Sequence, residues 1–159
     1  MRAENLGADR ACMACGLIAG TEPLPGGVIL RTAEWVVEHC VGPLGVGTLV
    51  VKPVRHVLHV ADLSAEESIE LGPLLRKVSS LLTSTMSPEQ VYVCLWSHAH
   101  AVPGHIHFVV QPVFKGDLAR YDAHGPALQM SMFAAGLLPD AAAVAKVCDR
   151  LRAAVAAGA

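Results

Sequence analysis

Hydrophobic and polar residues follow two different repeats along the chain, and these repeats separate expected strands from expected helices. Short runs rich in β-branched and aromatic residues, bounded by glycine or proline, are typical of strands. Such runs cover residues 28–31, 35–39, 45–52, 91–96 and 105–113. The pattern therefore predicts a sheet of about five short strands.

The clearest helix lies between the third and the fourth of these runs. Ser64 followed by Glu67 forms a capping box, in which each side chain satisfies a backbone amide at the helix start. Apolar residues then recur at helical spacing, which predicts an amphipathic helix over residues 65–84. The apolar residues are Ile69, Leu71, Leu74, Leu75, Val78, Leu81 and Leu82.

Two further helices are expected near the end of the chain, over residues 126–135 and 141–156. The first has proline at its start and Gly136 after its end, which are preferred positions for these residues. Strands and helices are mixed without strict alternation, and this order favours the α+β class. We predict an antiparallel sheet of about five strands, with the long helix and the C-terminal helices packed against it.

The composition is that of a folded chain, because 53% of the 159 residues are hydrophobic and only 16% are charged. A net charge of −2 offers no basic surface to a nucleic-acid polymer, whereas a small nucleotide requires none. The N-terminal stretch has no apolar run of signal-peptide length, and no other apolar run is long enough to span a bilayer. We therefore expect a cytoplasmic protein that binds neither nucleic-acid polymers nor membranes.

Cys12 and Cys15 are separated by two residues, a spacing at which two thiolates can bind one zinc ion. A redox pair or a coincidence of two small buried residues would also explain them. A structural zinc ion needs four protein ligands, so two more must come from the eight histidines of the chain. Spacing alone does not choose among these histidines.

The run at residues 105–111 carries histidine on only one face. Side chains alternate along a strand, so His105, His107, Val109 and Gln111 share one face. The opposite face is entirely apolar and consists of Ile106, Phe108 and Val110. The alternation is consistent with a functional histidine pair and also with ordinary polar residues on a half-buried strand.

Several ordered segments resemble the histidine triad (HIT-like) family, in particular its bacterial zinc-binding subgroup with a C-x-x-C. The segment HIHFVVQP at residues 105–112 is similar to the family signature H-φ-H-φ-H-φ-φ, in which φ is hydrophobic and proline usually follows. LVVKPVRH at residues 49–56 is similar to the family segment L-V-[IL]-P-K-x-H. The N-terminal C-x-x-C and the tail at residues 125–140 stand in the expected order, so the resemblance covers most of the chain.

The resemblance implies one HIT-like domain over residues 1–159. This domain comprises a zinc-binding segment at residues 10–20, a core at residues 27–114 and a C-terminal helical extension at residues 115–159. The zinc ligands carried over from the family are Cys12, Cys15, His56 and His105, which complete a closed tetrahedral shell of structural Zn²⁺. His59 is the alternative to His56, because both follow the same expected strand.

The resemblance also implies that His107 is a nucleophile. A neutral imidazole attacks the α-phosphorus of a nucleotide phosphoanhydride or phosphoramidate, and water or phosphate resolves the nucleotidyl-histidine intermediate. The backbone carbonyl of His105 would hold the proton on the other ring nitrogen. We expect a nucleotide hydrolase or nucleotidyl transferase that forms a homodimer. Candidate substrate-binding residues are Gln111, Ser97, His100, Trp35 and His39.

Three positions depart from the family pattern. Val109 occupies the third position of the triad, residues 101–104 lack a polar pair that contacts phosphate, and residues 39–43 lack an aspartate for the ribose. Ser97 and His100 would replace the polar pair, unless they belong to an ordinary polar surface loop. The alternative function is therefore a catalytically weak or inactive, zinc-stabilised nucleotide-binding or regulatory protein.

Overall fold

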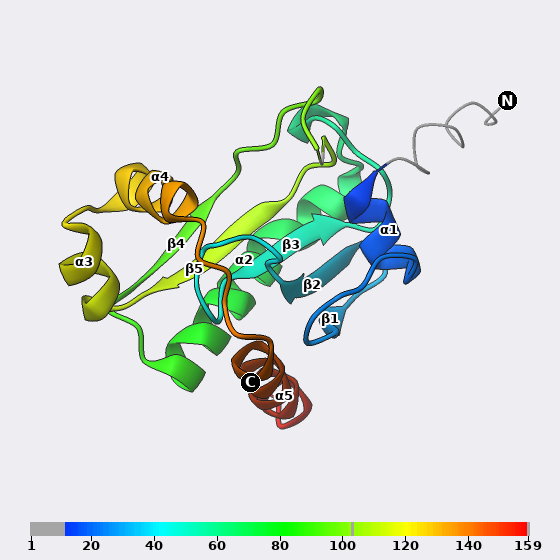
Figure 1. Cartoon of the computed structure of the whole chain (residues 1–159). Helices are drawn as coiled ribbons and strands as arrows, with labels where there is room; N and C mark the ends of the chain where they lie inside the picture. Colours follow the sequence, from blue (N-terminus) through cyan, green and yellow to red (C-terminus); the bar gives the residue numbers. More distant parts are fainter. Residues whose placement is uncertain (1–11, 103, 159) are drawn as a thin grey trace, which may run out of the picture.

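A five-stranded antiparallel sheet forms the centre of the computed structural model, which describes residues 12–102 and 104–158 (Figure 1). The strands are β1 Val28–Arg31, β2 Trp35–His39, β3 Leu49–Pro53, β4 Gln90–Cys94 and β5 Phe108–Val113. They lie in the order β1-β2-β3-β5-β4, and every neighbouring pair is antiparallel. Strands β1 and β4 therefore form the two edges of the sheet.

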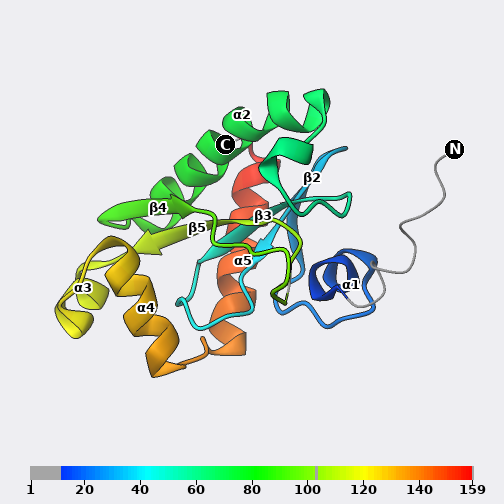
Figure 2. The same cartoon turned by 90° about the horizontal axis from the view of Figure 1, so that it is seen from above.

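Helices cover both faces of this sheet. They are α1 Met13–Ala19, the 3-10 helix η2 Val60–Asp62, α2 Ala65–Met86, α3 Lys115–Tyr121, α4 Gly125–Ala135 and α5 Ala141–Ala156. Seen from above in Figure 2, α2 lies along one side of the sheet, and α1 and α4 lie on the opposite side. Helix α5 packs against α2 and β1. None of the described helices combines the length and the apolar character that crossing a membrane requires.

The two faces of the sheet bury different sets of side chains. The larger core lies between the sheet and the helices α2 and α5, where Trp35, Leu49 and Val78 are inaccessible to solvent. A smaller cluster on the opposite face joins Val109 of β5 to Leu128 of α4. Helix α4 covers only part of this second face, so the remainder is available for a binding site.

The predicted α+β class and the antiparallel sheet are confirmed. Helix α2 begins as expected, with Ser64 Oγ accepting from the Glu67 amide at 3.1 Å and Glu67 Oε2 accepting from the Ser64 amide at 2.7 Å. The helix continues through Pro73 to Met86. Placing Ile69 on the buried face was wrong, because this side chain is 77% exposed.

Two predicted strands begin later than expected. The third begins at Leu49 rather than at residue 45, because Gly45 and Gly47 adopt φ values of 89° and 90° that belong to turns. The fifth begins at Phe108 rather than at residue 105. The backbone amide of Ile106 instead donates to the Val57 carbonyl at 2.8 Å, so residues 105–107 contact the segment that follows β3.

Residues 1–11, Pro103 and Ala159 lie outside the described ranges. They include residues 10 and 11 of the predicted zinc-binding segment, most of the N-terminal stretch that we searched for an export signal, and one position of segment 101–104.

Candidate functional site

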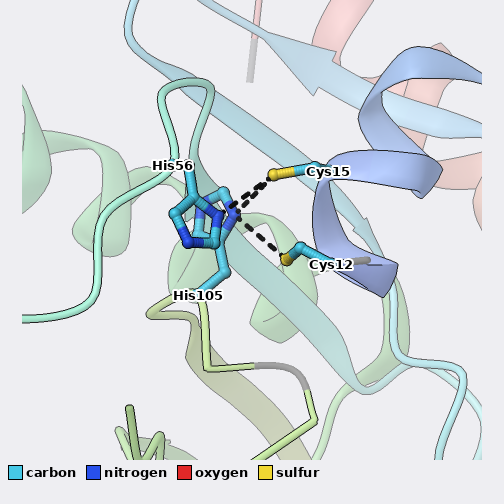
Figure 3. Close-up of side chains that lie close together, drawn as sticks. All are labelled: Cys12, Cys15, His56 and His105. Carbon is cyan, nitrogen blue, oxygen red and sulfur yellow. Dashed lines mark hydrogen bonds between the residues drawn. The ribbon is translucent and has the colours of Figure 1, made fainter. Parts of the chain in front are cut away.

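Four cysteine and histidine side chains from three separate segments meet beside one end of the sheet (Figure 3). Cys12 caps the N-terminus of α1 and Cys15 lies in its first turn, His56 follows β3, and His105 precedes β5. One ligand atom from each residue lies within 4.8 Å of those of the other three. These four residues, which we call the Cys2His2 cluster, are the set that the resemblance implied.

The spacing of the Cys2His2 cluster fits a tetrahedral metal ion. Cys15 Sγ lies 3.2 Å from His56 Nδ1 and 3.5 Å from His105 Nδ1, and Cys12 Sγ lies 3.9 Å from His105 Nδ1. Bonds of about 2.3 Å to sulfur and about 2.0 Å to nitrogen place the ligand atoms of a zinc tetrahedron roughly 3.3–3.8 Å apart. Two thiolates and two imidazoles are also the donors that zinc prefers, so this site fits zinc.

A hydrogen bond from Nε2, the ring nitrogen that points away from the Cys2His2 cluster, orients the side chain of His105 for metal binding. His105 Nε2 lies 2.9 Å from the Pro53 carbonyl, so this nitrogen carries the proton and donates it to the carbonyl. The lone pair is thereby left on Nδ1, which faces the two thiols. Burial and, next, the charge of His56 lower the pKa of His105 to about 4, so the imidazole is neutral near pH 7.

His59 lies outside the Cys2His2 cluster, at the start of η2, where it is exposed. The geometry therefore distinguishes His56 from the alternative that sequence spacing left open. Of the other cysteines, Cys148 is fully buried, whereas Cys40 and Cys94 are only partly buried.

His107 lies next to the Cys2His2 cluster and lines a cavity of about 380 Å³. Its Nδ1 is 3.0 Å from the backbone carbonyl of His105 and 3.0 Å from Ser97 Oγ. Ser97 Oγ also accepts the backbone amide of His107 at 3.2 Å. The carbonyl can only accept, so Nδ1 carries the proton, and the lone pair of the ring is on Nε2. The imidazole is thus held in the tautomer that a nucleophile requires.

The cavity lies on the face of the sheet opposite the larger core. Its floor consists of side chains from three neighbouring strands, namely Glu38, Val50, Lys52, Val109 and the preceding His107. Apolar residues of α1, of the loop after β2 and of α4 form much of its walls, for example Leu17, Leu44 and Phe133. Its volume lies within the range of about 300–1,000 Å³ that is usual for small-molecule sites.

Two of the five predicted substrate-binding residues line this cavity, namely Ser97 and His39. His39 is buried, and both of its ring nitrogens are engaged: Nδ1 donates to the Cys40 carbonyl at 2.7 Å, and Nε2 accepts from the Gly47 amide at 2.8 Å. Burial lowers the pKa of His39, so the ring stays neutral. His39 therefore shapes the wall but has no free nitrogen for a ligand.

The other three predicted substrate-binding residues lie away from the cavity. Trp35 is fully buried in the larger core, where its indole donates to the Glu67 carbonyl at 3.1 Å. Gln111 lies beneath α4 and exchanges hydrogen bonds with Leu44 and Gln129. His100 is exposed on the loop beyond Ser97. For Trp35 and His100 the resemblance gave a position in the chain but not the direction of the side chain, whereas Gln111 has the expected direction and is covered by α4.

Sequence reasoning missed the most polar part of the cavity floor. Glu38 of β2 and Lys52 of β3 form an ion pair whose side chains are 2% and 1% exposed. Glu38 Oε2 has no hydrogen-bond partner among the described residues. Burial raises the pKa of the Glu38 carboxyl, and the ammonium of Lys52 opposes this shift. Opposite charges inside two otherwise apolar strands were the signal that could have revealed this pair.

No family model matches the chain, and no curated protein sequence matches it. Solved structures do match its fold. A Hit-like protein involved in cell-cycle regulation from Bartonella henselae is 14% identical, with a TM-score of 0.70 over 90% of this chain and 95% of that one. A hypothetical histidine triad nucleotide-binding protein from Sulfolobus tokodaii is 14% identical, with a TM-score of 0.71 over 92% and 93%.

A third match concerns the metal site. A Zn-bound histidine triad family protein from Mycobacterium smegmatis is 16% identical, with a TM-score of 0.62 over 92% of this chain and 99% of that one. These three proteins share the order and arrangement of the elements described above. At such identities the likeness shows the fold.

Proposed function

We propose that this chain, whose fold is that of the histidine triad proteins, is a nucleotide hydrolase or nucleotidyl transferase with His107 as its nucleophile. The observation that carries the proposal is the pair of contacts that fixes the His107 ring. Its Nδ1–H is held by the His105 carbonyl at 3.0 Å, and the ring lines a cavity of about 380 Å³. A neutral imidazole with its lone pair toward such a cavity is suited to attack an electrophile bound there.

The reaction divides into two displacements at the α-phosphorus of a nucleotide phosphoanhydride or phosphoramidate. In the first, the Nε2 lone pair forms a bond to phosphorus, and the electron pair of the cleaved bond leaves with the phosphate, or with the amine, whose nitrogen takes up a proton from water. The ring then bears a positive charge, which the His105 carbonyl stabilises through Nδ1–H. In the second, water or phosphate attacks phosphorus, the electron pair of the N–P bond returns to Nε2, and an attacking water releases its proton to the solvent. Ser97 orients the ring throughout, because its hydroxyl contacts both Nδ1 and the amide of His107.

Zinc in the Cys2His2 cluster would have a structural role in this proposal. The four donors complete a tetrahedral shell, which leaves no open position for substrate. Binding would join α1 to the ends of β3 and β5 and would fix the backbone of His105. The Zn-bound protein from Mycobacterium smegmatis supports this assignment by fold.

The test is turnover by purified, zinc-loaded protein. Adenosine and guanosine 5′-phosphoramidates and a dinucleoside polyphosphate are incubated with the protein, and the nucleoside monophosphate is quantified by chromatography. We expect monophosphate to accumulate, and intact mass spectrometry after acid-free quenching to show a nucleotidyl adduct on the protein. A complete lack of turnover of all these substrates would contradict the proposal.

A non-catalytic nucleotide-binding protein is the second candidate. Val109 favours it, because this side chain lines the cavity beside His107 but offers no hydrogen bond to a phosphate oxygen. Calorimetry with nucleoside monophosphates separates the two candidates. Binding together with turnover supports the enzyme, whereas binding without turnover supports the second candidate.

The edge strand β4 supports the expected homodimer. No strand lies beyond β4 in the described part of the chain, and its Val93 and the following Trp96 are 45% and 64% exposed. An edge with unpaired backbone groups and exposed apolar side chains can pair with the same edge of a second copy. We predict that analytical ultracentrifugation gives a dimer, and that Val93→Lys shifts it to a monomer.

Val60→Lys is the matched control for this prediction, because Val60 is 52% exposed and belongs to η2 rather than to β4. It introduces the same charge and should leave the dimer intact. A monomeric wild-type chain, or a dimer that tolerates lysine at position 93, would show that β4 is not the interface.

A further inference from the structure

The Glu38–Lys52 ion pair lies at the bottom of the cavity and uses only part of its hydrogen-bonding capacity. Lys52 Nζ donates to Glu38 Oε1, while Glu38 Oε2 is buried without a partner in the described residues. An ammonium carries three N–H groups, and Glu38 is its one hydrogen-bond partner within residues 12–102 and 104–158. The floor therefore presents a free acceptor next to free donors.

Such a pair is costly to keep for stability alone. Removing two charges from water costs several kcal/mol for each ion, and replacing a buried pair with apolar residues of similar volume is often neutral or stabilising. A buried carboxylate oxygen without a hydrogen bond adds to that cost. Both charged side chains line the cavity, so a bound molecule is the partner that can satisfy these atoms.

The strand register places the pair beside the proposed nucleophile. Val50 lies opposite Val109 and Val51 opposite Phe108, the residue that follows His107. Glu38 lies opposite Val50 on the next strand, β2. Lys52 lies opposite Val36, so the ion pair spans β2 and β3 diagonally, and both of its side chains line the cavity together with His107. A nucleotide whose phosphate lies at His107 can extend its remaining part over Lys52 toward Glu38.

We infer that the Glu38–Lys52 pair recognises the edge of a nucleobase in which an N–H group adjoins a carbonyl, as in guanine and hypoxanthine. This inference rests on the proposed function, because it assumes that a nucleotide occupies the cavity. Lys52 donates to the carbonyl, and Glu38 Oε2 accepts the neighbouring N–H.

Charge and shape favour this edge over other chemistry. Lys52 already neutralises Glu38, so a neutral N–H suits Oε2 better than a second cation. A carbonyl oxygen offers two lone pairs to an ammonium, and Lys to the guanine carbonyl is a preferred contact in base recognition. The walls are apolar, with Leu17, Leu44 and Phe133 among them, which suits the flat faces of a base. A ribose in the same place would leave hydroxyl groups against apolar side chains.

The test measures base preference with the complete, zinc-loaded chain. Calorimetry compares inosine 5′-monophosphate with purine riboside 5′-monophosphate, which lacks the N–H and carbonyl of the base, and with adenosine 5′-monophosphate. We expect wild-type protein to bind the inosine nucleotide about tenfold more tightly than the purine riboside nucleotide. In Glu38→Met/Lys52→Met, the ratio of the two affinities should fall to about one. A wild-type ratio near one, or a ratio unchanged in the double variant, overturns the inference.

A second variant keeps the test valid if the double variant does not fold. Glu38→Gln preserves the shape and the oxygen that faces Lys52, but turns the free oxygen into an NH₂ donor. The preference for the inosine nucleotide should then disappear while circular dichroism remains that of the wild type. A preference for ribose over 2′-deoxyribose that depends on the pair, in place of a base preference, would assign these residues to the sugar and overturn the inference.

The outcome is separable from that of the proposed function. Turnover without a base preference that depends on the pair removes this inference alone. A preference that depends on the pair, without turnover of any phosphoramidate or dinucleoside polyphosphate, removes the proposed catalysis alone.

Discussion

His107→Ala is expected to abolish turnover of nucleoside phosphoramidates, with kcat lowered by a factor of about 10³ or more. The variant removes the lone pair that is proposed to form the bond to phosphorus, and the structure offers no substitute at the adjacent position, because Val109 lines the cavity there. The His107 ring makes hydrogen bonds only to the His105 carbonyl and to Ser97 among the described residues, so its loss removes few contacts between helices and strands. The fold should therefore persist, and the loss should appear in kcat rather than in stability. Steady-state kinetics and thermal unfolding measure the two effects separately.

His100→Ala is the matched control for this variant. It also replaces a histidine with alanine, but at an exposed position outside the cavity, so the variant should retain the wild-type rate. The nucleotidyl adduct should be detectable on wild-type protein and on His100→Ala, and absent from His107→Ala. Substantial turnover by His107→Ala would mean that another group attacks phosphorus.

Loss of the metal is expected to produce the largest change in stability. The Cys2His2 cluster joins residues that are 41 and 93 positions apart in the chain, through Cys15 and His56 and through Cys12 and His105. Structural zinc contributes apparent binding energies of about 10–16 kcal/mol in small domains, which equals or exceeds the usual stability of a fold. We predict one zinc ion per chain by mass spectrometry. Chelation or His56→Ala should lower Tm by roughly 10 °C or more.

His59→Ala is the control, because His59 is exposed three residues beyond His56 and lies outside the cluster. It should retain both the zinc ion and the wild-type Tm. Full zinc content in His56→Ala, or its loss in His59→Ala, would contradict the assignment of the ligands.

Local sequence signals predicted those helices and strands whose first and last residues are marked in the sequence itself, by capping residues, glycine or proline. The bounds of β1, β2 and α5 agree with the prediction, and the capping box of Ser64 and Glu67 identified the start of α2. Helix α1 was missed, because its 7 residues are too few to show a clear helical repeat of apolar positions. The short helix α3 gave no distinct apolar repeat and was missed as well.

The parts of the candidate site that were predictable are those in which the residue type alone determines the chemistry. Cys12, Cys15, His56 and His105 meet as the resemblance implied, and the proton acceptor of His107 is the expected carbonyl. The roles of residues that depend on which distant helix or strand packs against them were not predictable.

Gln111 shows why this second group could not be predicted. It lies on the face of β5 that Val109 shares, but α4 covers it, and a pattern along one strand contains no information about a distant helix. The Glu38–Lys52 pair depends in the same way on the register between β2 and β3. Cross-strand neighbours of this kind emerge only when both strands are placed.

The dual use of His105 has a consequence for protein engineering. Its imidazole belongs to the Cys2His2 cluster, while its main-chain oxygen serves His107. Any amino acid supplies that oxygen, so the role proposed for His107 places no restriction on the side chain at position 105. Cysteine there would offer an alternative zinc ligand and still leave the acceptor in place. The Cys2His2 cluster can thus be redesigned without loss of the hydrogen bond that orients His107, provided that the backbone of residues 105–107 keeps its position.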